Sequence, residues 1–432
     1  MSDASDDAEL STATASDLQE EPPLTILRWV CPDCEQPTAL SDRTVVIGRD
    51  PDCTTQLASA RVSRKHADVR RNADGYLVRD LDSKNGVFVN ATRVKKALLR
   101  VGDVLRVGDF IAVVEAISPP ELPGFRDLGY GFFGGPALRR VLRRANELAP
   151  QPLDLILLGE TGTGKKTLAR AIHRLSGRSG SCVVVDARAL PADALAHELF
   201  GPAASDDGAS ASVGRLQVAR AGTLVLEEVT ALPLDLQKRL AVSRGASAHG
   251  ARHGDSDFRL IGTNREPLGE RGPRFFDPEL RARLEAAIIA VPPLRQRRSD
   301  IVPLFVRLLA RHSQNADVTL EAELLEHLCL LAWPMNVLEL DDVAYRLAAR
   351  YSSESELKLR HFLELTGRLD SASRGASRAA PRRQVLTYSH TEILALNAAL
   401  ERNRGNLTKA AGDLGITRAK AYRMLRSAKS QR

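Results

Sequence analysis

A glycine-rich segment that ends in a lysine has the clearest chemistry in the sequence. Residues 159–165 read GETGTGK, after the apolar run 153–158 and before the helix-periodic run 167–175. Glycines let the backbone curl so that its N–H groups face phosphate oxygens, and Lys165 can reach the β- and γ-phosphates. The segment predicts ATP binding by Gly159, Glu160, Thr161, Gly162, Thr163, Gly164, Lys165, Lys166 and Thr167.

Polar residues end two later apolar runs. Glu227 and Glu228 follow residues 222–226, and Asn264 stands three residues after the run 258–261. Because such strand ends meet beside a phosphate-binding loop, we expect Glu227 to bind Mg²⁺, Glu228 to activate water and Asn264 to sense the γ-phosphate. Simple solvation of strand ends is the alternative interpretation.

Three short polar clusters occur within the first ninety residues. They are Gly48-Arg49, the segment 63–66 (SRKH) and Asn85-Gly86. A phosphate dianion needs guanidinium and hydroxyl donors held on loops by a rigid scaffold, and Arg49, Ser63 and Arg64 can supply them. The carboxamide of Asn85 can hold a peptide backbone in register. Polar loop residues without a ligand are the alternative.

The last forty residues have the periodicity of three short helices. The third of them begins at Thr417 and carries Arg418, Lys420 and Arg423 on its outer face. From Gly367 onward there are fourteen Lys and Arg residues against four Asp and Glu residues, which favours a polyanionic partner. The pattern predicts a DNA-binding helix-turn-helix, and three solvated helices are the alternative.

The spacing of apolar residues indicates which elements hold these side chains. Short alternating segments before residue 118 predict an all-β sandwich, and strands alternating with helices after residue 130 predict a parallel α/β sheet. We therefore expect a multidomain chain that begins with a disordered acidic tail at 1–23, an all-β sandwich at 24–117 and a linker at 118–129. An α/β nucleotide-binding subdomain at 130–302 and a strand-free helical lid at 303–366 follow. A basic linker at 367–386 then leads to an all-α DNA-binding domain at 387–432.

Composition excludes some function classes. No apolar run approaches the length of a membrane span, and the acidic start lacks the basic and apolar regions of a secretion signal. We therefore expect a cytoplasmic protein without a membrane partner. Cys31 and Cys34 form a CxxC pair with no second pair nearby, so reduced thiols are favoured over a metal or redox role.

The amino-terminal clusters occur in the order found in a known family. Residues 24–116 resemble the forkhead-associated (FHA) family, whose loops at one end of a β-sandwich bind phosphothreonine peptides. The resemblance implies that Arg49, Ser63, Arg64 and Asn85 contact such a peptide. It also implies that His66 braces the loop without touching the phosphate.

The central and carboxyl-terminal patterns resemble two further families. Residues 130–350, with ELFG at 198–201 and VPPLRQRRSDI at 291–301, resemble the AAA+ domain of sigma-54-dependent enhancer-binding proteins. That resemblance implies a ring-forming, homo-oligomeric ATPase that remodels RNA polymerase with sigma-54. The segment GNLTKAAGDLGITRAKAYRML resembles the Fis-type domain, which implies that Thr417, Arg418, Lys420 and Arg423 face double-stranded DNA.

Several departures from the AAA+ pattern concern catalysis. The GAFTGA loop that contacts sigma-54 is missing after ELFG, where the chain reads PAASDDGASASVGRL. Lys166 stands where most phosphate-binding loops carry Ser or Thr, so a hydroxyl ligand for Mg²⁺ would come from elsewhere, such as Thr167. The remaining changed positions are Glu227 for Asp, Asp277 for the first interface arginine, Asp186 for Asn and Leu338 for the lid arginine.

Of the two arginine-finger positions of that family, only the second is an arginine in this sequence, Arg283. We also expect Asp277 to place negative charge toward the phosphates, the wrong sign for stabilising their transition state. The sequence favours a DNA-binding regulator that binds ATP with slow or absent turnover. An ATP-hydrolysing sigma-54-dependent activator is the first alternative, and a phosphopeptide-binding adaptor is the second.

Overall fold

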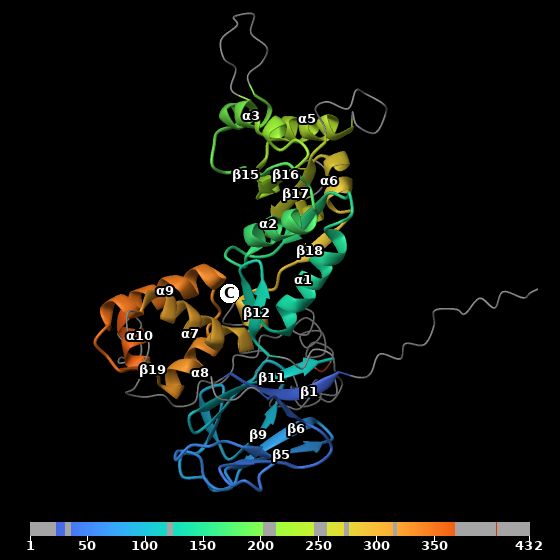
Figure 1. The fold of residues 1–432 in the computed structure, drawn as a ribbon. Helices are drawn as coiled ribbons and strands as arrows, with labels where there is room; N and C mark the ends of the chain where they lie inside the picture. The colour runs from blue at the N-terminus through green and yellow to red at the C-terminus, as the bar shows by residue number, and fades with distance from the viewer. Residues whose placement is uncertain are drawn as a thin grey trace, which may run out of the picture. The chain divides into compact units, whose positions relative to one another are not determined.

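The structure is a computed structural model of the 432-residue chain (Figure 1). It describes residues 23–30, 36–118, 124–201, 213–245, 257–271, 276–313 and 318–367, together with Asn403. Contacts divide the chain into two compact units, Met1–Gly367 and Arg368–Arg432. The predicted helix-turn-helix and all but the last residue of the predicted acidic tail lie outside the described residues, and so does the Cys31–Cys34 pair.

The amino-terminal domain is the two-layered β-sandwich that the alternating segments predict. One sheet has the strand order β2-β1-β11-β10-β7-β8 and the other β4-β3-β5-β6-β9. Alternate residues point inward, so side chains such as Leu27, Ile47 and Leu105 form a fully buried core between the layers. The strands are β1 (Leu24–Trp29), β2 (Thr38–Ala39), β3 (Val45–Gly48), β4 (Thr55–Gln56), β5 (Ala67–Asn72), β6 (Gly75–Asp80), β7 (Val87–Val89), β8 (Thr92–Val94), β9 (Lys96–Leu99), β10 (Val104–Val107) and β11 (Phe110–Ile117).

A small hairpin precedes the central domain. Its strands β12 (Arg126–Gly129) and β13 (Phe132–Gly134) pair antiparallel, and β12 falls inside the segment predicted as a linker. Turn glycines and the apolar pair Phe132-Phe133 make the hairpin possible, but a segment with three glycines and only three aliphatic or phenylalanine side chains gave too weak a pattern to predict it. Phe132 is buried in the central core, so the hairpin belongs structurally to the domain that follows it.

The central domain is a five-stranded parallel sheet with the order β15-β16-β17-β14-β18. The strands are β14 (Leu155–Leu158), β15 (Cys182–Asp186), β16 (Thr223–Glu227), β17 (Arg259–Asn264) and β18 (Ile288–Ala290). Its helices are α1 (Pro136–Leu148), α2 (Lys165–Leu175), α3 (Ala192–Phe200), α4 (Arg215–Val218), α5 (Leu234–Gly245) and α6 (Pro278–Leu284). Apolar clusters bury both faces of this sheet, which explains why its strands read as continuous apolar runs.

A helical subdomain follows the sheet. It consists of α7 (Ile301–His312), α8 (Ala322–Leu330), α9 (Asn336–Arg350) and α10 (Leu359–Thr366), around the buried side chains of Phe305, Trp333 and Phe362. The expectation of a lid without strands is wrong in one detail. Two residues each from β19 (Thr319–Leu320) and β20 (Glu356–Leu357) form a short parallel pair, too short to give a period-two pattern.

The β-sandwich and the helical subdomain share a packed contact. An apolar cluster joins Ile111 and Val113 of β11 to Leu325 and Cys329 of α8. Beside it, Arg106 of β10 is buried and donates from Nε to Glu326 Oε2 of α8 at 2.7 Å. No helix within the described ranges is long and apolar enough to cross a membrane.

Candidate functional site

The glycine-rich loop lies where the sequence predicts it, between β14 and α2. Gly159, Gly162 and Gly164 all have positive φ, at 155°, 76° and 104°, which only glycine adopts readily. A side chain on Gly162 would overlap the backbone carbonyl of Met335. The loop therefore has the curled backbone that turns its N–H groups toward an anion at the start of α2.

Lys165 lies at the base of this loop. Its side chain is largely buried, and Nζ donates to the carbonyl oxygens of Gly159 at 2.5 Å and Glu160 at 3.1 Å. Burial lowers the pKa of the Lys165 ammonium, and the carboxylate of Glu228, 4.0 Å away, partly offsets that effect. The ammonium is thus held beside the loop by carbonyls that a phosphate group could replace.

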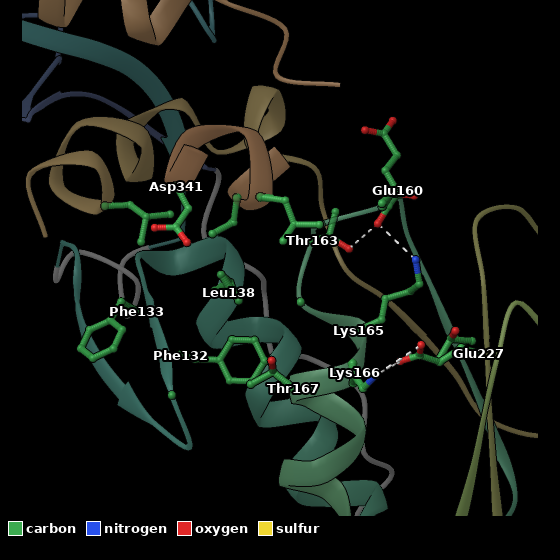
Figure 2. A pocket seen from close by; sticks show the side chains of 18 of the residues that line it. Phe132, Phe133, Leu138, Glu160, Thr163, Lys165, Lys166, Thr167, Glu227 and Asp341 are labelled. Carbon is green, nitrogen blue, oxygen red and sulfur yellow. Dashed lines mark hydrogen bonds and ion pairs between the residues drawn. The ribbon is translucent and has the colours of Figure 1, made fainter. Parts of the chain in front are cut away.

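The loop opens into a pocket of about 430 Å³ (Figure 2). One part is polar, with the glycine-rich loop, Lys166, Arg188 and Glu227. The other part is apolar, and its lining side chains are Phe132, Phe133, Leu138, Leu304, Val337 and Leu338. A polar end built on backbone N–H groups and lysines, joined to an apolar end, fits a phosphorylated molecule that carries a planar base.

Two carboxylates stand at the end of β16. Glu227 Oε1 lies 3.2 Å from Lys166 Nζ, and both side chains line the pocket. Glu228 also lines the pocket and has a left-handed backbone with φ of 52°, and its N–H donates to Thr263 Oγ1 at 3.2 Å. The structure therefore places both carboxylates beside the phosphate loop, where the sequence predicts them.

Asn264 is placed differently from the prediction. Its carboxamide is buried, donates to the Glu266 carbonyl at 2.6 Å and accepts from Thr230 Oγ1 at 2.8 Å. Thr263, one residue earlier, lines the pocket instead. Successive strand residues point to opposite sides, so Thr263 and not Asn264 presents its side chain to the pocket.

The two predicted interface residues, Asp277 and Arg283, have local partners, and so does Asp186. Asp277 accepts a hydrogen bond from the Leu280 N–H at 3.0 Å and caps α6, and its expected effect on phosphates across a subunit interface stays a prediction. Arg283 pairs with Glu279 at 2.5 Å, and Asp186 accepts from the Arg188 N–H at 2.9 Å. None of the three residues Asp277, Arg283 and Asp186 lines the pocket of this chain.

The helical subdomain touches the loop through residues that the sequence analysis missed. Asn336 Nδ2 donates to the Thr161 carbonyl at 2.9 Å and to Glu160 Oε2 at 3.2 Å, while its Oδ1 accepts from the Leu294 N–H at 2.8 Å. Arg295 holds Glu160 with two hydrogen bonds of 2.5 and 2.6 Å, which lower the pKa of the Glu160 carboxyl. The signal for Arg295 was present in PPLR at 292–295, a segment used only for the resemblance, and the signal for Asn336 was present in WPMN at 333–336.

A second group of predicted residues lies on loops of the β-sandwich. Gly48 lets these loops meet, because a side chain there would overlap the Arg64 carbonyl. The Arg49 N–H donates to the Ser63 carbonyl at 3.0 Å, and the Lys84 N–H donates to Ser63 Oγ at 3.1 Å. The loops that carry Arg49, Ser63, Arg64 and Asn85 are therefore brought together, with both arginines exposed.

His66 braces these loops, as predicted. It is fully buried, and its Nδ1 accepts from the Ser63 N–H at 3.0 Å while Nε2 lies 3.1 Å from the Gly86 carbonyl. Asn85 Nδ2 donates to the Arg61 carbonyl at 2.6 Å, which ties it to the adjacent loop. Across the described part of the chain, Arg49 and Arg64 have no carboxylate ion-pair partner, so both guanidinium groups are available to an anion.

Known protein families match the parts of the chain that carry the phosphate loop and the sandwich loops. Residues 133–287 match the Sigma-54 interaction domain, residues 45–108 the FHA domain and residues 295–377 the AAA+ ATPase lid domain. The transcriptional regulatory protein ZraR of Klebsiella oxytoca is 35% identical over 67% of this chain and 67% of its own length. This chain belongs to the family of sigma-54-dependent transcriptional regulators. The predicted FHA sandwich and the AAA+ domain with its lid are thereby confirmed.

Other similar proteins also cover about two thirds of the chain. The formate hydrogenlyase transcriptional activator of Salmonella typhimurium is 33% identical over 68% of this chain, but the match spans only 43% of that protein. The solved structure of NtrX from Brucella abortus is 25% identical and covers 67% of this chain and 68% of its own, with a TM-score of 0.48. The predicted Fis-type domain lies beyond the described residues and remains a prediction.

Proposed function

We propose that this family member is a DNA-binding regulator whose central domain binds ATP and whose FHA domain binds a phosphothreonine-containing protein. ATP occupies the pocket beside β14, where it links the α/β subdomain to the lid and favours a homo-oligomer. In this proposal the FHA ligand and the nucleotide together control the DNA-bound state.

The geometry of the phosphate loop carries the nucleotide part of this proposal. Lys165 lies beside three glycines of positive φ, and Lys166 and Arg188 add two further cations to the same pocket. These groups suit the charge of a triphosphate. The apolar side chains of Phe132 and Leu138 provide a surface for the base.

The same site supports slow or absent hydrolysis. Asn264 is occupied by local hydrogen bonds, Asp277 caps a helix, and the lid position expected to carry an arginine is the exposed Leu338. No arginine or metal ligand from these positions stabilises charge on a transferring phosphate. Together with the missing GAFTGA sequence, this argues against remodelling of the sigma-54 holoenzyme in the usual way.

The alternative is an ATP-hydrolysing sigma-54-dependent activator. Family membership favours it, as does Glu228, which stands at the end of β16 with its side chain lining the pocket. In that case Glu228 is the general base, and Arg283 acts on a neighbouring subunit's nucleotide. RNA polymerase with sigma-54 is then the partner. A phosphopeptide-binding adaptor is the remaining alternative, and DNA binding would distinguish it.

The phosphothreonine site uses the exposed guanidinium groups of Arg49 and Arg64 with the hydroxyl of Ser63. Their loops are held together by His66, which pre-organises charged donors around one anion. Asn85 would hold the backbone of the bound peptide. Thr417, Arg418, Lys420 and Arg423 would contact DNA, a role that rests on the sequence alone.

Two binding measurements on the full-length protein test this proposal. Titration with ATP should show saturable binding that Lys165→Ala abolishes, and titration with operator-length double-stranded DNA from a selection should show binding that falls steeply with salt. Absence of binding to any duplex at low salt would refute the regulator and leave the adaptor. Unchanged ATP binding in Lys165→Ala would refute the nucleotide site.

A further inference from the structure

Lys166 lies next to Glu227, the carboxylate at the end of β16 that this fold would use to bind a catalytic Mg²⁺. Its Nζ lies 3.2 Å from Glu227 Oε1 and 3.5 Å from Oε2, so one ammonium group faces both carboxylate oxygens (Figure 2). Phosphate-binding loops ordinarily place a hydroxyl here as a magnesium ligand. This chain places a cation there instead.

The residues present do not fit a divalent metal. Mg²⁺ requires oxygen ligands in near-ideal octahedral geometry, but the Glu227 oxygens already face an ammonium group. Thr167 also lines the pocket, but the oxygens of Glu227 are faced by the Lys166 ammonium and not by a hydroxyl group (Figure 2).

The neighbouring pair has the same arrangement. Glu228 Oε1 lies 4.0 Å from Lys165 Nζ and 3.8 Å from Arg265 Nε. Each carboxylate at the end of β16 is thus opposed by a cation of this chain. A divalent ion would have to enter beside two ammonium groups and displace one of them, which like-charge repulsion opposes.

We infer that the pocket binds its nucleoside triphosphate as the metal-free anion, with the Lys166 ammonium in the place of the divalent ion. This inference rests on the proposed nucleotide-binding function. Lys166 neutralises Glu227, which would otherwise repel the phosphates, and its remaining N–H donors are free to bind phosphate oxygens. The pocket then senses the nucleotide without the ion that hydrolysis would need.

The test is the affinity of full-length protein for ATP in two buffers, one with excess Mg²⁺ and one with EDTA. The two dissociation constants should agree within about threefold, because the protein supplies the cation. A loss of tenfold or more in EDTA would overturn the metal-free site while leaving the nucleotide-binding proposal intact. No binding in either buffer would overturn both.

Variants of Lys166 give the second arm. Lys166→Gln should weaken binding in EDTA by about tenfold and make binding depend on Mg²⁺, while Lys166→Arg should keep the wild-type behaviour. Lys238→Gln, on the exposed face of α5, is the matched control and should change neither constant. If Lys166→Gln binds ATP as wild type in both buffers, Lys166 does not replace the ion. The comparison of the wild-type protein in the two buffers does not depend on whether any variant folds correctly.

Discussion

Asn336 of the lid and Thr161 of the phosphate loop are joined by a hydrogen bond of 2.9 Å, from the Asn336 Nδ2 to the Thr161 carbonyl. Asn336 is fully buried and has a positive φ of 50°, a backbone conformation that asparagine tolerates better than most residues. The Val337 N–H also donates to the Gly162 carbonyl at 3.1 Å. The start of α9 is therefore fastened directly to the loop that would hold the phosphates.

Asn336→Ala should weaken ATP binding and destabilise the fold. The change leaves the Leu294 N–H and the Thr161 carbonyl without their partner, at a cost of about 1–3 kcal/mol for the buried groups. Isothermal titration with ATP and urea unfolding measure the two effects. Met335→Ala, at the adjacent and half-exposed position, is the control. Equal ATP affinity in both variants would show that Asn336 does not couple the lid to the loop.

Arg49→Ala should reduce phosphothreonine-peptide binding by at least about tenfold without unfolding the domain. A charge-assisted hydrogen bond to phosphate is lost, whereas Arg49 has no carboxylate partner in the described residues whose loss would destabilise the fold. Fluorescence anisotropy with a phosphothreonine peptide library measures the affinity. Arg43→Ala, on an exposed turn before β3, should bind as wild type. Normal binding by Arg49→Ala would remove the site from this end of the sandwich.

The ion pair between Arg106 and Glu326 should couple the sandwich to the lid. Both side chains are nearly buried, and Glu326 Oε1 also accepts from the Ala91 N–H at 2.7 Å. Glu326→Ala should cost about 1–3 kcal/mol, because the buried Arg106 guanidinium loses its closest partner and keeps only Glu323, 2.9 Å away.

A double-mutant cycle with Arg106→Met and Glu326→Met, followed by urea unfolding, measures the coupling itself. A coupling energy close to zero would mean that the pair does not hold the two domains together. The exposed pair Arg71–Asp42 is the matched control, and its removal should change the free energy of unfolding little.

Asp300 should make stability fall as the pH rises between about 4 and 6. Complete burial raises the pKa of its carboxyl to about 6 despite the nearby Arg297 and the Gly135 N–H, and Glu115 raises it further. The folded state therefore keeps a proton that the unfolded chain loses near pH 4, so ionisation of Asp300 opposes folding above that pH.

Asp300→Asn should remove this part of the pH dependence, on the order of 3 kcal/mol between pH 4 and pH 7. The carboxamide oxygen introduced by this change could still accept from the Gly135 N–H, which in the wild type donates to Asp300 Oδ1 at 2.7 Å. Urea unfolding at both pH values, with Asp74→Asn as an exposed control, measures the difference. The same pH dependence in Asp300→Asn and the wild type would contradict the assignment.

Periodicity and motif spacing predicted the sandwich, the parallel sheet and the positions of the phosphate loop and of Glu227. These features depend on local order along the chain, which a sequence displays directly. The contacts of Asn264 and Asn336 depended on partners far away in sequence or on the side to which one residue points, whereas the capping of α6 by Asp277 is local. Neither a hydrogen bond from Thr230 nor the approach of the lid to Gly162 leaves a periodic signal.

We propose that this chain binds ATP without turning it over at the rates of an ordinary AAA+ enzyme. The direct measurement is phosphate release by the full-length protein at saturating ATP and Mg²⁺, with and without DNA, beside Lys165→Ala. We expect saturable ATP binding and phosphate release no faster than that of the Lys165→Ala variant. Release on the order of one per second or faster that Lys165→Ala abolishes would contradict the account and establish the hydrolysing activator instead.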